Sequence, residues 1–174
     1  YKRQIKELSY KAYKGKWSKL PQFSTLEPFS EGVLADGLLD IRPAKMREHY
    51  GMVFEGRIEA PKNGKYRFEL ASDDGARLLI NGKRVINHDG LHGASTKKGE
   101  LELSAGPHVL RVEYFAYGQP NRLRASWSGP GFSDTPLSIE AKAPKQLAAA
   151  NTGEARAIRA LQAGYTARLC SPRF

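Results

Sequence analysis

The sequence predicts an all-β fold, an antiparallel β-sandwich, over residues 1–140. Two observations predict it. Apolar and charged residues alternate with a period of two along several segments, the pattern of strands with one buried face. Gly, Pro, Asn and Asp punctuate these segments at spacings of roughly 8 to 12 residues, which is typical of sandwiches. The composition, 40% hydrophobic and 26% charged, suits a globular domain with its own core.

The predicted strands begin near residue 52. Their apolar residues share one face in each strand: Met52, Phe54, Ile58 and Ala60, then Tyr66, Phe68 and Leu70. Asn81-Gly82 predicts a type I′ hairpin, because both central residues of that turn need a positive φ. It joins a strand over 76–80 to one that starts at Val85. The segments 101–103, 108–117 and 123–127 supply the remaining strands.

The two ends of the chain differ from this pattern. In the first 50 residues, five breakers interrupt any long element, so we expect short edge strands and loops that wrap the sandwich: Pro21, Pro28, Gly32, Gly37 and Pro43. Residues 141–152 are predicted as a linker, and 153–170 as a C-terminal helical tail. Its apolar stripe, which we expect to dock on the sandwich or on a neighbouring segment, consists of Ile158, Leu161, Tyr165 and Leu169.

Charge and motifs exclude several function classes. The formal net charge of +10 favours an acidic partner, but Lys and Arg are spread along the chain and form no dedicated groove. The stretch "YKAYKGKWSK" (10–19) mixes aromatics with lysines, a nucleic-acid pattern; we interpret its aromatics as packing and expect no nucleic acid. Cys170 has no partner for a disulfide or a Cys-based metal site. No apolar run approaches the length of a membrane span. No catalytic motif is found in the sequence, so we do not expect an enzyme.

An acidic pair, Asp73-Asp74, interrupts the strand pattern within "SDDGARLLINGKRVINHDG" (72–90). One interpretation is a polar turn whose carboxylates accept backbone hydrogen bonds. A second is a calcium site, because calcium prefers oxygen ligands. A third is direct binding of sugar hydroxyls by the two acids. Neighbouring side chains in a strand point to opposite faces, so the two acids share an ion only if their link is kinked or cis. Gly75 permits such a departure.

The loop "HDGLHG" (88–93) carries two histidines on either side of Asp89. We expect it to lie beside the acidic pair, with Asp89 or His92 reaching a ligand. A zinc site at His88 and His92 is the alternative. Four aromatics lie in regions that we interpret as irregular or loops and offer their ring faces to a sugar: Tyr13, Trp17, Tyr117 and Phe132. The aromatics of the strands are predicted to be core: Tyr66, Phe68, Tyr114 and Trp127.

Five segments together resemble the PA14 domain, over roughly residues 10–130: "YKAYKGKWSKLPQFSTLEP" (10–28), "FEGRIEAPKNGKYRFELASDDGARLLINGKRVIN" (54–87), "HDGLHG" (88–93), "LSAGPHVLRVEYF" (103–115) and "ASWSGPG" (125–131). The resemblance implies a carbohydrate-binding or adhesive sandwich, not a catalyst. In the family's sugar-binding yeast adhesins, an adjacent Asp pair holds a calcium ion that coordinates sugar hydroxyls, assisted by an Asn from a later loop. The pair maps onto Asp73 and Asp74. Candidates for the partner are Asn87, Asn121 and Asp134.

The function predicted from these observations is non-catalytic glycan binding by a lectin-like adhesion module of a larger secreted, cell-surface or periplasmic protein. The ligand is expected around Asp73, Asp74, Asn87, Asp89 and His92, with calcium at Asp73 and Asp74. The alternative is a structural or protein-interaction module with no glycan ligand, which docks neighbouring domains and in which the acidic pair is only a turn.

Overall fold

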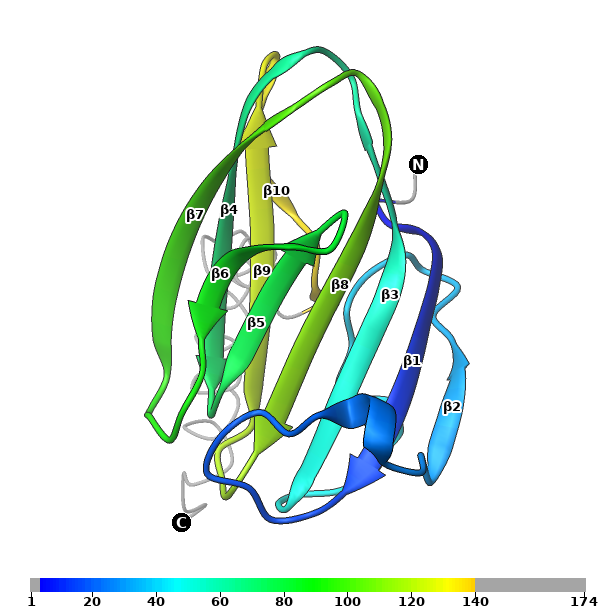
Figure 1. The fold of residues 1–174 in the computed structure, drawn as a ribbon, viewed down its shortest axis with the longest axis vertical. Helices are drawn as coiled ribbons and strands as arrows, with labels where there is room; N and C mark the ends of the chain where they lie inside the picture. Colours follow the sequence, from blue (N-terminus) through cyan, green and yellow to red (C-terminus); the bar gives the residue numbers. More distant parts are fainter. Residues whose placement is uncertain (1–3, 140–174) are drawn as a thin grey trace, which may run out of the picture. The chain divides into compact units, whose positions relative to one another are not determined.

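A computed structural model describes residues 4–139, which form two antiparallel sheets packed face to face (Figure 1). The larger sheet has the order β2-β1-β3-β8-β5-β6, with bounds Ser30–Val33, Lys6–Lys14, Tyr50–Ala60, Gly106–Ala116, Ala76–Ile80 and Lys83–His88. The smaller has the order β10-β9-β4-β7, with bounds Phe132–Pro136, Arg122–Gly129, Gly64–Asp73 and Ser95–Leu103. Two short 3-10 helices, Phe23–Thr25 and Arg42–Ala44, complete the elements.

The predicted sandwich is thereby confirmed. The expected linker (141–152) and helical tail (153–170) lie outside the described residues. None of the helices within residues 4–139 is long and apolar enough to cross a membrane.

Alternating residues of the two sheets build one core between them. β3 and β8 pair in unbroken register from Tyr50↔Ala116 to Ala60↔Gly106, and alternate residues of β3 beyond Phe54 are buried. The core aromatics predicted from the sequence are inside, with Tyr66, Phe68 and Tyr114 fully buried and Trp127 5% exposed. The strand pattern therefore positions a rigid scaffold beneath the connecting loops.

The prediction that the first 50 residues supply only edge strands and loops is wrong for β1. This strand spans nine residues and lies between β2 and β3, with Ala12 opposite both Ser30 and Met52. The breakers Pro21 and Pro28 come after its end, so they do not interrupt it. Tyr13 therefore lies in a strand, and Phe132 begins β10.

The loop after β1 covers part of the outer face of the larger sheet. Phe23 in this loop is buried against Tyr13 and Val53. Trp17, Leu20 and Leu26 of the same loop pack around them. Trp17 contacts Phe23 edge-on at 6.1 Å between ring centroids, so its indole takes part in packing. The loop is thus an integral layer of the fold.

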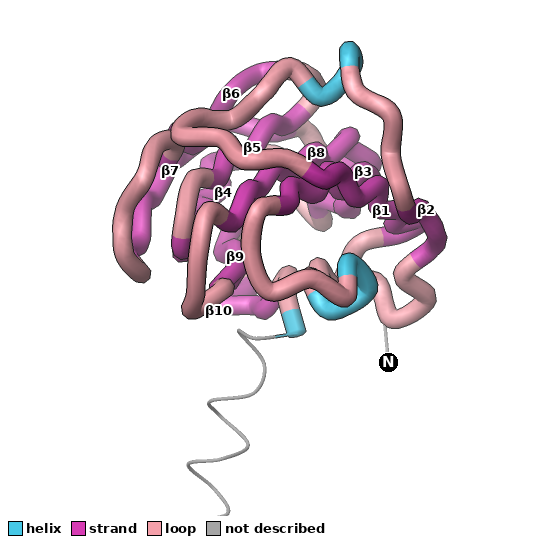
Figure 2. Tube along the Cα trace, turned by 90° about the horizontal axis from the view of Figure 1, so that it is seen from below, coloured by secondary structure: helices cyan, strands magenta, loops and turns pink. Residues whose placement is uncertain are grey.

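The antiparallel topology gathers the longer loops at one end of the sandwich, which Figure 2 shows from below. β1, β4, β6 and β8 end there, and β3, β5, β7 and β9 begin there. We call this the loop end. The opposite end, where β3 turns into β4 and β9 into β10, we call the turn end.

Candidate functional site

Asp73 and Asp74 lie together at the loop end, where β4 finishes. Their peptide bond is cis, one of the two backbone arrangements that the sequence analysis required for a shared ion. Both residues are nearly buried, at 9% and 8% exposure. Within residues 4–139, neither carboxylate takes part in an ion pair. Among the described residues, two acids are therefore buried side by side without an ion-pair partner.

Backbone groups of neighbouring loops hold the pair in place. Asp74 Oδ2 accepts a hydrogen bond from the backbone N–H of Tyr117 at 2.7 Å. The Asp73 carboxylate accepts one from the N–H of Ala94. Tyr114 donates its hydroxyl to the backbone carbonyl of Asp73 at 2.7 Å. These contacts tie the acids to the loop before β7 and to the loop after β8.

The electrostatic environment disfavours the charge on Asp73. Burial is the largest cause that raises the pKa of its carboxyl group, and the adjacent Asp74 charge raises it further. Positive charge on His92, the Ala94 N–H and Arg122 lower that pKa in part. The net effect is still upward, so the surroundings do not fully compensate for the cost of a charged Asp73 carboxylate. A bound cation would stabilise this charge.

A buried polar network extends from the pair to Asn121. Tyr114 hydrogen-bonds to Tyr50, and the side-chain amide of Asn121 donates to the Tyr50 hydroxyl. Burial raises the pKa of Tyr50 to about 12 and also raises that of Tyr114, so both stay protonated. The other atom of the amide, Asn121 Oδ1, is buried and has no hydrogen-bond partner within residues 4–139, as is also the case for Ser72 Oγ and Trp127 Nε1. Of these three atoms, the amide oxygen is the one that can serve as a strong metal ligand.

These donors fit calcium better than zinc. The described residues contain no cluster of three or more His, Cys, Asp or Glu side chains that would hold a metal. Two carboxylates, the Oδ1 atom of Asn121 and backbone carbonyls are instead all oxygen donors, the set that calcium accepts. The fit rests on the buried acidic pair and on the unpartnered Oδ1 of Asn121, which is connected to the pair through Tyr50 and Tyr114.

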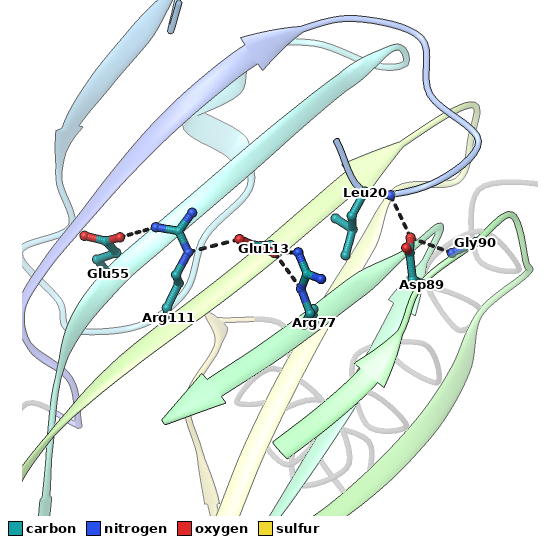
Figure 3. Close-up of polar contacts among 7 residues, drawn as sticks. All are labelled: Leu20, Glu55, Arg77, Asp89, Gly90, Arg111 and Glu113. Atoms are coloured by element: carbon teal, nitrogen blue, oxygen red, sulfur yellow. Dashed lines mark hydrogen bonds and ion pairs between the residues drawn. The ribbon is translucent and has the colours of Figure 1, made fainter. Parts of the chain in front are cut away.

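Asp89 lies next to the pair but is engaged with the backbone. Its Oδ1 accepts hydrogen bonds from the N–H groups of Leu20 and Gly90, both at 2.7 Å (Figure 3). A Cβ placed on Gly75 would come within 3.0 Å of this same oxygen. Asp89 therefore clamps the loop after β1 to the loop after β6, close behind the acidic pair.

The two histidines of the 88–93 loop stack on each other, with ring centroids 3.9 Å apart. His88 Nε2 lies 3.0 Å from the Ser95 carbonyl and 2.9 Å from its Oγ. His92 directs Nε2 at the His88 carbonyl and Nδ1 at the Gly93 carbonyl, each at 2.9 Å. Burial lowers the pKa of His88. The ring nitrogens thus fold the loop, an arrangement that gives no support to the zinc alternative.

Asn87 lies apart from this cluster. It is exposed on β6 and pairs in register with Arg77, while its neighbour His88 is buried. Successive strand residues face opposite sides, so the side chain of Asn87 shares the outer face of the larger sheet with Arg77. The structure brings Asp73, Asp74, Asp89 and His92 together and leaves Asn87 outside. Asn121, another of the three candidates for the partner, lies in the loop between β8 and β9. β8 pairs with β5 and β9 pairs with β4, the two strands that flank the acidic pair, and this topology is the signal that favours Asn121 over Asn87.

Of the four aromatics considered as sugar faces, Tyr117 lies beside the acidic pair. Its backbone N–H binds Asp74, its ring meets His49 edge-on at 5.4 Å, and Lys16 Nζ lies 5.2 Å from the ring centroid. Of the other aromatics considered as sugar faces, Tyr13 of β1 and Trp17 of the following loop pack against Phe23, and Phe132 packs on Trp127 with 4.8 Å between ring centroids. Those three are part of the packing.

Comparisons with known proteins point to one family. A relative is the anti-sigma-I factor RsgI3 of Acetivibrio thermocellus, 28% identical over 108 residues. That match covers 61% of this chain, which spans only 15% of the relative's length. A PA14 sugar-binding domain from an RTX adhesin superposes with a TM-score of 0.56 at 19% identity, over 76% of this chain and 94% of that one.

The Epithelial Adhesin 9 A domain from Candida glabrata, solved in complex with Galβ1-4GlcNAc, superposes with a TM-score of 0.58 at 11% identity, over 77% of this chain and 87% of that one. At these identities the structural likeness shows the fold. Residues 34–138, more than half of the chain, match the PA14 domain family itself. The chain therefore belongs to the PA14 domain family.

Proposed function

We propose that this PA14 module binds glycans without catalysis, through a calcium ion held at the loop end by Asp73, Asp74 and Asn121. The observation that carries the proposal is the buried acidic pair, which has no ion-pair partner within residues 4–139. Hydrogen bonds through Tyr114 and Tyr50 connect it to Asn121, whose Oδ1 has no partner within the same residues. When bound, calcium supplies coordination positions that vicinal sugar hydroxyls can fill.

The protein's own groups prepare this site. The N–H groups of Tyr117 and Ala94 orient the two carboxylates. The Tyr50 hydroxyl accepts a hydrogen bond from the Asn121 amide nitrogen, and the Oδ1 atom of that amide has no partner within residues 4–139, so it can act as a ligand. Each oxygen is preorganised before the ion arrives, so little ordering remains to oppose binding.

The rim of the site supplies groups that suit a sugar. Tyr117, half-buried, offers a ring beside Asp74, and Lys16 above that ring is exposed. An aromatic face takes the C–H side of a sugar while charged groups take its hydroxyls. Sugar-binding relatives, the RTX adhesin domain and the Epithelial Adhesin 9 domain, support this ligand class and a setting outside the cell or at its surface.

A structural or protein-interaction module is the second candidate, and one feature of the sandwich favours it. Val33, at the end of the edge strand β2, is 75% exposed, and Phe29 just before the strand is 40% exposed. An apolar, unpaired edge is a surface on which another chain can dock. In this case the acidic pair would contribute to the fold alone.

A glycan array probed in calcium and again with a chelator tests the proposal. We expect binding that calcium supports and the chelator abolishes. The double variant Asp73→Asn with Asp74→Asn should bind no glycan in either condition. Asp36→Asn, at an exposed acid in the segment between β2 and β3, is the matched control and should bind as the wild type does. Glycan binding that is indifferent to the chelator and to the double variant would refute the proposed site, and an array without any bound glycan would favour the interaction module.

A further inference from the structure

A polar groove runs along the outer face of the smaller sheet, next to the acidic pair. Its floor is Ala71 of β4, a small side chain between larger ones on both neighbouring strands. Thr96 of β7 lies opposite Ala71 on one side, and Arg124 of β9 lies opposite it on the other. The hollow follows from this register, because alanine leaves open the space that a long side chain would fill. Its volume is about 330 Å³, within the range of small-ligand pockets.

The groove is continuous with the loop end. Ser95 and Ala94 line it, and the N–H of Ala94 is a hydrogen-bond donor to Asp73. Arg122 also lines it and pairs in register with Asp73, whose pKa it lowers. An oligosaccharide with one end bound at the acidic pair would therefore extend into the groove, which adjoins the pair on the same face of the sheet.

The side chains of the groove combine hydroxyls with a cation. Ser95, Thr96 and Ser126 offer hydroxyl groups that donate and accept hydrogen bonds. Arg124 is exposed and, within residues 4–139, takes part in no ion pair. A guanidinium donates two parallel hydrogen bonds to a carboxylate, a geometry that no neutral hydroxyl reproduces.

The acids at the groove's margin do not cancel this cation. Glu69 binds Lys98 at 2.9 Å, so its charge is already paired. Asp134 also lines the groove and has a partner of its own. The chain as a whole carries a formal charge of +10, which attracts an anionic ligand.

We propose that this groove, built on Ala71 and Arg124, is a second subsite that binds an acidic sugar unit, a hexuronate whose carboxylate meets Arg124. The inference rests on the proposed function, because it places the first unit of the same glycan at the acidic pair. It adds the substrate class: an anionic glycan, bound in preference to its neutral counterpart.

The test compares hexuronate trisaccharides with the same trisaccharides after reduction of their carboxylates to alcohols. Isothermal titration calorimetry with excess calcium should show tighter binding of the acidic form, by about tenfold, as a charge-assisted pair provides. Raising the salt concentration should reduce this preference, since exposed charges are screened.

Two variants locate the preference. Arg124→Gln removes the cation and should make the acidic and reduced forms bind equally, with the neutral form unchanged. Ala71→Met fills the floor without changing charge and should weaken the acidic trisaccharide to a similar extent. Arg84→Gln, which makes the same charge change on β6 of the other sheet, is the control and should keep the preference.

The outcomes separate the two proposals. Equal affinity of the wild type for the two forms, binding of neither form, or a preference that survives Arg124→Gln, would overturn the groove. Calcium-dependent binding of neutral sugars would then still support the acidic pair. A preference that is lost in Arg124→Gln but is indifferent to Asp73→Asn with Asp74→Asn would support the groove and count against the acidic pair as the primary site.

Discussion

The turn end and the loop end of the sandwich satisfy their backbone hydrogen bonds by different means. At the turn end, short connections such as Asn81-Gly82 close hairpins with φ of 51° and 78° at the two residues, and neutral amide side chains accept backbone N–H groups, as Asn81 does for Val109. At the loop end, acidic side chains accept the N–H groups of loops: Asp89 from Leu20 and Gly90, and Asp74 from Tyr117. Acids at the loop end thus hold the fold together even before any ligand is considered.

Because of this difference, we expect the two ends to contribute differently to the stability of the fold and to ligand binding. Asp89 uses its Oδ1 to accept two loop N–H groups, whereas Asp73 and Asp74 are buried side by side with no ion-pair partner within residues 4–139. Substitutions at the turn end should therefore change stability alone. Substitutions at the loop end should divide into those that loosen the scaffold and those that remove the ligand.

The largest effect on stability is expected from Gly75→Ala, at the centre of the loop end. The added Cβ would lie 2.4 Å from Phe115 Cε1 and 3.0 Å from Asp89 Oδ1. Overpacking of this kind costs about 1–3 kcal/mol, measured as a lower free energy of unfolding in urea. Gly93→Ala, where the added Cβ meets no atom within 4 Å, is the matched control and should cost close to nothing. Equal losses in both variants would contradict the close packing around Gly75.

Asp89→Ala should come next, because it leaves the N–H groups of Leu20 and Gly90 without their acceptor. The loss should be about 1–3 kcal/mol of unfolding free energy. Hydrogen exchange of those two amides should speed up more than that of core amides in β3. Asp89→Asn keeps an acceptor oxygen and should lose less. Unchanged exchange at Leu20 would show that the clamp does not hold the loop after β1.

At the turn end, Asn81→Ala should cost about 1 kcal/mol, with no change in calcium or glycan binding. Asn81 accepts the Val109 N–H at 2.9 Å and contacts His108 Nδ1 at 2.8 Å, and its φ is positive. Asn81→Gly keeps the turn conformation but loses both contacts, so it should fall between the wild type and the alanine variant. An effect of either substitution on ligand affinity would break the separation between the two ends.

The smallest effect concerns the pH dependence of stability without calcium. The pKa of Asp73 is raised in the fold above its ordinary value of 3.8, mainly by burial. The folded state therefore holds this proton more tightly than the unfolded state, and stability declines as pH rises from 3.8 through the raised pKa. Asp73→Asn should flatten this decline in urea titrations with a chelator present. A variant with the same pH profile as the wild type would show that Asp73 is not the group responsible.

Much of the fold was predictable from alternation and turns, since strands such as β3 and β4 and the Asn81-Gly82 hairpin depend on local sequence. The acidic pair and its glycine were also visible in the sequence. The central place of β1 was missed because the prolines that suggested an edge lie beyond its end. The role of Asp89 depends on Leu20, 69 residues away, and the groove depends on the register of Ala71 with Arg124. Such contacts are set by tertiary pairing, which no local pattern records.

Calcium binding measured by isothermal titration calorimetry tests the central claim most directly. We predict that the wild-type protein binds a single calcium ion, that Asp36→Asn does so equally, and that Asp73→Asn with Asp74→Asn gives no heat of binding. Calcium should also raise the melting temperature of the wild type and leave that of the double variant unchanged, because a ligand stabilises only the state that binds it. A wild-type protein that takes up no calcium, or a double variant that binds it as tightly, would contradict the account.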